Sequence, residues 1–241
     1  MAGHSKWANI KHRKGRQDAL RGKKNTKLIR EVTVAVREGG ADPKSNSRLR
    51  LAIAKAYAEN VTKDSINRAI DKGLGQNDSS TYTEVMYEGY GPAGVAMLVL
   101  CLSDNKNRTV AEVRHAFNKY GGNLGTDGSV SYLFDRRGLL VCDGVGDFDA
   151  FMNDMLAVAV DDIDMPESEV AVVDMAPGLL SEALAVCEAQ QYHVLQSDIV
   201  WQAQVELELN AQQREKLQTL VDVLEDLDDV QSVFTNVKDC G

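Results

Sequence analysis

The stretch AGVAMLVLCLSDNKNRTVAEVRHAFNKYGG, residues 93–122, joins an apolar run to an amphipathic segment. Residues 95–102 are continuously apolar, which indicates a buried strand. Asp104 or Asn105 can cap the helix that follows, because a short polar side chain at this position accepts a bond from a free backbone N–H. The helix presents one apolar face and ends at a pair of glycines, and residues 129–134 then read as a second strand. The apolar face consists of Val110, Val113, Phe117 and Tyr120.

The same β-α-β order returns near the C-terminus. Residues 201–209 alternate between apolar and polar like a strand. Asn210 with Gln213 three positions later forms a capping-box pattern, and a leucine-lined helix and a last strand at 230–237 follow. Two β-α-β halves can close one split ferredoxin-like sheet.

Three helices are expected before these strands, at 26–37, 48–59 and 62–73, with Thr26 as the first cap. We therefore predict an α+β, multidomain protein, with a small helical N-terminal domain and two α/β domains. One α/β domain is ferredoxin-like and is split by insertion of the other. The predicted divisions are 1–80 for a basic arm and helical domain, 81–137 plus 201–241 for the split domain, and 138–200 for the inserted acidic domain.

Charge is distributed unevenly along the chain, whose formal net charge is −9. Residues 1–75 hold 18 Lys and Arg against 7 Asp and Glu, whereas the remainder holds 9 against 29. Such asymmetry indicates different partners for different parts of a chain. The acidic runs at 161–164 and 225–229 are interpreted first as solvated faces.

No motif for catalysis, a cofactor or a metal is present, so we expect no enzyme, no cofactor and no metal site. The glycines at 121–128 follow a helix and precede a strand, the reverse of a phosphate-binding loop, and indicate turns. The four cysteines are far apart and indicate reduced thiols. Because the first residues lack an apolar signal core and the longest apolar run is too short to span a bilayer, we expect a cytoplasmic protein without a membrane partner.

The basic N-terminal segment carries most of the functional information. Residues 1–30 contain ten Lys and Arg and one carboxylate, Asp18. Residues 1–25 bury too little apolar surface to fold alone and are expected to form a mobile arm. Lysine and arginine in such an arm can neutralise phosphates with release of counterions. Trp7 either stacks on an exposed base, as in single-stranded RNA recognition, or anchors the arm on the helical domain.

Several long motifs resemble the YebC/PmpR family: AGHSKWANIKHRKG, TKLIREVTVAVREGG, INRAIDKGLG, YEGYGPAGVAMLVLCLSDNKNRTVAEVRHAF and LEDLDDVQSVFTN. The resemblance implies a three-domain protein and a probable transcriptional regulator that binds DNA. Relatives that include a mitochondrial translational activator of cytochrome oxidase act on translation. Arg108 and His115 fall within the resemblance and form either a second functional surface or interdomain packing.

We therefore expect a non-enzymatic, DNA-binding transcriptional regulator. The alternative is a ribosome-associated translation factor whose arm binds rRNA, and in either case the acidic α/β domains can recruit a protein partner. No helix with base-reading residues at groove-fitting spacing is evident from the sequence. The candidate nucleic-acid-binding residues are His4, Lys6, Trp7, Lys11, His12, Arg13, Lys14, Arg16, Arg21, Lys23, Lys24, Lys27, Arg30, Arg48 and Arg50.

Overall fold

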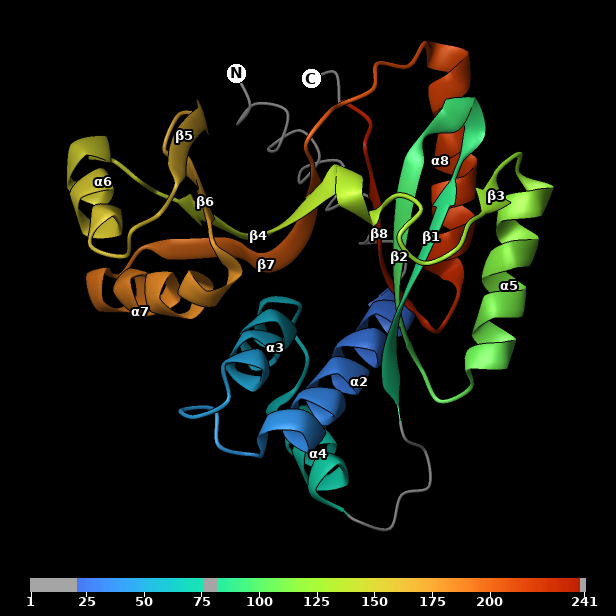
Figure 1. The fold of residues 1–241 in the computed structure, drawn as a ribbon. Helices are drawn as coiled ribbons and strands as arrows, with labels where there is room; N and C mark the ends of the chain where they lie inside the picture. The colour runs from blue at the N-terminus through green and yellow to red at the C-terminus, as the bar shows by residue number, and fades with distance from the viewer. Residues whose placement is uncertain (1–20, 76–81, 239–241) are drawn as a thin grey trace.

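A computed structural model describes residues 21–75 and 82–238 (Figure 1). The chain begins with three helices, followed by two four-stranded antiparallel sheets that carry helices. This arrangement confirms the predicted α+β class. No described helix is long and apolar enough to cross a membrane.

The three N-terminal helices pack around an aliphatic core formed by residues such as Val32, Leu49 and Ile66. The side chains of Asn46 and Thr62 accept backbone N–H bonds and so cap the second and third helices. The prediction for the first helix was wrong at its start, because the helix already includes residues 21–25 and Thr26 lies inside it. The three helices are α2 (Arg21–Gly39), α3 (Ser47–Ala58) and α4 (Lys63–Leu74).

The first sheet has the order β3-β1-β2-β8, and every neighbouring pair is antiparallel. Strand β2 is the apolar run recognised in the sequence, and its odd-numbered residues face two helices that cover one side of the sheet. Asn105 caps the first of these helices, and Asn210 with Gln213 forms the predicted capping box of the second. The elements are β1 (Thr83–Tyr90), β2 (Ala96–Ser103), α5 (Lys106–Lys119), β3 (Asn123–Leu124), α8 (Ala211–Asp226) and β8 (Val230–Thr235).

The second sheet has the order β5-β6-β4-β7, also antiparallel throughout. Two helices pack on it around a core that includes Phe151, Met155 and Leu180. The three described cysteines, Cys101, Cys142 and Cys187, are free and buried, whereas Cys240 lies outside the described residues. The elements are β4 (Phe134–Asp143), α6 (Phe148–Leu156), β5 (Asp162–Glu167), β6 (Val170–Met175), α7 (Leu180–Gln190) and β7 (His193–Ala203).

Two predicted strands of the split sheet were wrong. Residues 131–133 form a short 3-10 turn that leads into β4, and residues 201–203 are the end of β7 in the second sheet. Between Ala203 and α8, the chain forms a single bridge, between Leu207 and Val237, in place of a strand. The alternation of residues 201–209 is real, but alternation does not indicate which sheet a strand joins. The proposed domain limits at 137 and 200 fall inside β4 and β7, and that division stays a prediction.

A buried carboxylate fixes the loop between β3 and β4. Glu88 on β1 is 7% exposed and accepts three backbone N–H bonds of 2.8 Å each, from Gly128, Val130 and Ser131. Burial alone would raise the pKa of Glu88, but these bonds to the charged form outweigh burial and leave the pKa below its usual value. The nearby glycines form turns, with Gly128 in the left-handed region at φ +81°.

Candidate nucleic-acid interface

Helix α2 inserts two of the candidate cations into the acidic turn between α8 and β8. The ammonium of Lys27 donates to the backbone carbonyl of Glu225 at 2.7 Å. Arg30 Nη1 lies 2.9–3.1 Å from the backbone oxygen of Asp228, the backbone oxygen of Leu102 and Oδ1 of Asp229. Cations are favoured beside the C-terminus of a helix, where the backbone carbonyls are unpaired. The interpretation of residues 225–229 as a solvated face was therefore wrong for Asp229, which is buried, whereas the side chains of Asp226 and Asp228 are exposed.

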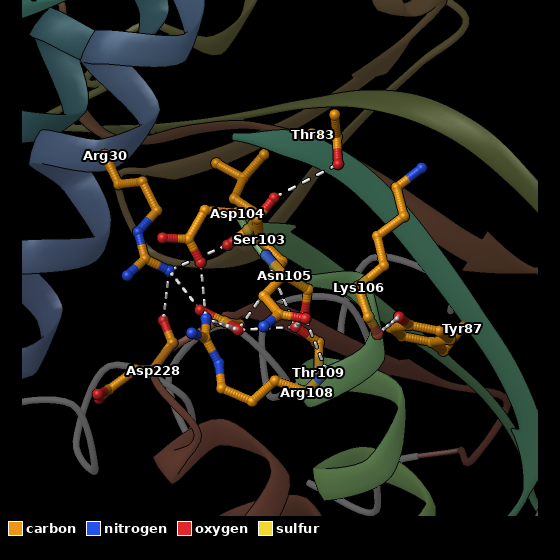
Figure 2. Close-up of polar contacts among 12 residues, drawn as sticks. Arg30, Thr83, Tyr87, Ser103, Asp104, Asn105, Lys106, Arg108, Thr109 and Asp228 are labelled. Atoms are coloured by element: carbon orange, nitrogen blue, oxygen red, sulfur yellow. Dashed lines mark hydrogen bonds and ion pairs between the residues drawn. The ribbon is translucent and has the colours of Figure 1, made fainter. Parts of the chain in front are cut away.

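Asp229 is the centre of this junction and is 2% exposed. Its Oδ2 accepts bonds from Thr109 at 2.7 Å, from Arg108 at 2.7 Å and from Ser103 at 3.1 Å. Figure 2 shows how Ser103, Thr109 and the two arginines converge from α2, β2 and α5. One buried carboxylate, in the turn between α8 and β8, therefore ties β2 and α5 to helix α2 of the helical domain.

The electrostatics of the junction follow from its donors. Burial would raise the pKa of Asp229, but the hydrogen bonds from Arg108 and Thr109 stabilise the carboxylate and hold the pKa below its usual value. Burial lowers the pKa of Lys27 more than the neighbouring carboxylates raise it. The hydrogen bonds to Asp229 and Asp104 raise the pKa of Arg108.

Beside the junction lies a polar pocket of about 510 Å³. Its lining combines Arg30 and Arg108 with several carboxylates. The pocket therefore has no uniform charge that would select an anion or a cation. Among residues 21–75 and 82–238, no group of three or more metal-ligating side chains is present. The pocket is lined by Arg30, Asp104, Arg108, Glu112, Asp226, Leu227, Asp228 and Asp229.

Helix α3 makes a second junction, with both α/β units. Arg48 pairs at 2.7–2.8 Å with Glu31 and Glu38 of α2 and with Glu84 of β1. Burial disfavours the charge of Arg48, but its bond to Glu31 and the three carboxylates raise its pKa overall. Arg50 donates to Ser181 Oγ at 2.5 Å, at the start of α7.

Comparison with known proteins identifies the chain. Residues 5–76 match the model described as TACO1/YebC protein N-terminal domain, and residues 82–237 match the model described as TACO1/YebC second and third domain. The chain belongs to the TACO1/YebC family. The resemblance stated from the sequence motifs is thereby confirmed.

Curated members of the TACO1/YebC family cover nearly the whole chain. A protein of Aeromonas hydrophila is 53% identical over 236 residues, spanning 98% of this chain and 96% of the relative, and is named a probable transcriptional regulatory protein. A protein of Francisella philomiragia with the same name is 51% identical over 237 residues, with the same two coverages. The crystal structure of the conserved hypothetical protein Aq1575 from Aquifex aeolicus matches with a TM-score of 0.81 and 40% identity, covering 91% of each chain.

The candidate binding residues of this YebC-family chain fall into two groups. Arg21 and Lys23 lie in helix α2, and Lys24 pairs with Glu59 at 2.5 Å. Together with Lys27, Arg30, Arg48 and Arg50, Lys24 is engaged with other parts of the protein, and nucleic-acid binding by these residues stays a prediction. The other group lies outside the described residues and comprises His4, Lys6, Trp7, Lys11, His12, Arg13, Lys14 and Arg16.

The role of Arg108 and His115 is also clearer from the structure. Arg108 contributes to the junction, through Asp229, while its side chain stays 45% exposed. His115 is exposed on the outer side of α5. Sequence reasoning missed Asp229, because its partners Arg30 and Arg108 lie 199 and 121 residues earlier in the chain.

Proposed function

We propose that this chain is a non-enzymatic regulator of gene expression that acts in the cytoplasm and binds DNA through its basic N-terminal segment. The observation that carries the proposal is the excess of ten Lys and Arg over one carboxylate in residues 1–30. Phosphate neutralisation gives such a segment a physical use. Lys24, Lys27, Arg30 and Arg50 contact carboxylates, hydroxyls or carbonyls within the protein. The residues before Lys24 therefore have the main role in binding phosphates.

The relatives' names support transcription as the regulated process. Full-length relatives that are more than 50% identical carry the name probable transcriptional regulatory protein. The acidic remainder of the chain fits a role away from phosphates. Residues 138–200 contain no Lys or Arg at all, so this part faces away from the nucleic acid or recruits a protein partner.

Trp7 favours a second candidate function, in translation. An aromatic side chain among cations suits exposed bases of irregular RNA better than stacked duplex DNA. In this reading the arm binds rRNA and the protein is a ribosome-associated translational activator.

The salt dependence of DNA binding tests the role of the arm. If about half of the ten cations contact duplex phosphates, the logarithm of affinity falls with the logarithm of salt at a slope of roughly −4 to −5. Replacing Lys11, Arg13 and Lys14 by glutamine is expected to make that slope shallower by about 3. The measurement is fluorescence anisotropy of labelled duplex DNA in a salt series.

In a matched control variant, three exposed cations elsewhere are replaced by glutamine, namely Lys44, Lys63 and Lys216. It should leave the slope nearly unchanged. Equal effects of the two triple variants would show that net charge, and not the arm, governs binding.

Sedimentation of cell lysate through a sucrose gradient separates the two candidate functions. Co-migration of the native protein, but not the arm variant, with ribosomes would favour translation. Retention of chromosomal DNA by the native protein alone, with both proteins at the top of the gradient, would favour transcription.

A further inference from the structure

Cations are scarce in the α/β part of the chain, yet they gather on α5. Of the nine Lys and Arg in residues 76–241, four lie in this one helix, which holds a single carboxylate, Glu112. Glu112 is on the side of α5 that lines the pocket with Arg108. The rest of the outer surface of α5 therefore carries positive charge in an otherwise acidic region. The four cations are Lys106, Arg108, Arg114 and Lys119.

Three of the four cations are available to a partner. Lys106, Arg114 and Lys119 are exposed, and no ion pair within residues 21–75 and 82–238 involves them. Lys119 lies over the ring of Tyr120, with 5.3 Å between the ammonium and the ring centroid. This contrasts with Lys24, Lys27 and Arg30 of α2 and Arg48 of α3, which are bound to carboxylates and carbonyls of the protein.

The exposed face also carries residue types that read bases. Asn107, Arg114 and Asn118 are separated by seven and four residues and so lie along one side of the helix, with the small Ala111 between them. All four are exposed. Arginine can bond to guanine in two places, and asparagine can do the same with adenine.

The opposite face of α5 fixes the direction of this row. Val113 and Phe117 are fully buried in the core under the first sheet, and Asn105 caps the helix start. In Figure 1 α5 stands at the edge of the molecule, beside α8 and the short strand β3. The row of side chains is thus held on a rigid helix that no described element covers on its outer side.

From these observations we infer that the outer face of α5 is a second nucleic-acid contact, which enters the major groove of B-form DNA. The helix is about 21 Å long at 1.5 Å per residue, and that groove, about 12 Å wide, admits an α-helix. A-form RNA is a poorer fit because its major groove is deep and narrow. The inference rests on the proposed DNA binding. It adds that the outer face of α5 selects the DNA sequence, while the N-terminal arm supplies most of the affinity.

Replacing Arg114 by glutamate in the full chain tests this surface. The variant is expected to bind a mixed-sequence DNA duplex of about 30 base pairs, roughly three helical turns, about tenfold more weakly, with a salt slope shallower by about 1. Lys216→Glu makes the same charge change on the neighbouring helix α8, where the side chain is also exposed, and should change affinity less than twofold. Arg114→Gln, which keeps the length of the side chain, should weaken binding in the same direction. Thermal unfolding of each variant verifies the fold.

The outcomes separate this inference from the proposed function. If the native protein binds DNA and the Arg114→Glu variant binds it as tightly as the Lys216→Glu variant, the inference is overturned. The arm then remains the DNA-binding element. A loss of equal size on an A-form RNA duplex of the same sequence would overturn the groove assignment. Absence of DNA binding by the native protein would instead refute the proposed function.

Discussion

Replacing Asp229 by alanine is expected to lower the free energy of unfolding by about 3–5 kcal/mol. Asp229 is nearly inaccessible and receives bonds from Arg30, Arg108, Thr109 and Ser103. Removing it leaves the guanidinium of Arg30, 13% exposed, without its carboxylate partner. The loss is measured as the shift of the urea unfolding midpoint.

The neighbouring Asp228 provides the matched control. Its side chain is exposed, and only its backbone oxygen accepts a bond from Arg30. Asp228→Asn should change stability by about 0.5 kcal/mol or less. A double variant, Asp229→Ala with Arg30→Met, should be less destabilised than the sum of the two single variants, because neither partner then stays charged alone. Similar stabilities of Asp229→Ala and Asp228→Asn would refute the importance of the junction.

Replacing Glu88 by alanine is the second large expected effect, a loss of about 3 kcal/mol in the free energy of unfolding. Three backbone N–H groups of the loop before β4 lose their acceptor at once. Buried donors without partners keep the full cost of their desolvation. Exposed Glu112, changed to glutamine, is the control. Hydrogen exchange of Gly128 and Val130 should accelerate in the Glu88 variant, and unchanged exchange would contradict this role of Glu88.

The lowered pKa values of Asp229 and Glu88 predict that the free energy of unfolding depends on pH in the acidic range. Their folded-state pKa values lie below the usual values of about 3.9 for Asp and 4.3 for Glu. Each therefore contributes its full stability above those usual values, and this contribution is lost as the pH falls through the lower folded-state pKa. Urea unfolding below about pH 4.3 should show a steep decline for the native chain. The decline should be shallower for Asp229→Asn and Glu88→Gln, and parallel curves would contradict the assignment.

The local elements were largely predictable because their signals are local. The continuous apolar run of β2, the cap Asn105, and the capping box of Asn210 with Gln213 each lie within a few residues of what they determine. The start of α2 was missed because the dense positive charge of residues 21–25 argued against ordering. An ion pair with Glu59, distant in sequence, offsets part of that charge.

The long-range features could not be predicted in the same way. Strand alternation at 201–209 is compatible with either sheet, and the pairing of residues 201–203 with β4 places them in the second sheet. The acidic run at 225–229 looked solvated because its partners, Lys27 and Arg30, lie about two hundred residues earlier. The exposed row of Asn107, Arg114 and Asn118 on α5 was missed since the net charge of the surrounding region is strongly negative.

Strands β4 and β7 give the acidic region an unusual attachment. They pair along their length, from Phe134 opposite Ala203 to Asp143 opposite His193. The chain therefore leaves the first sheet and returns to it through adjacent residues, such as Gly138 opposite Ile199. In topological terms, everything between is the tip of one very long β-hairpin. A two-residue Asn-Gly turn could join β4 to β7 near the pair Gly138 and Ile199. The acidic residues between them could then be removed without changing the path of the backbone through the rest of the protein.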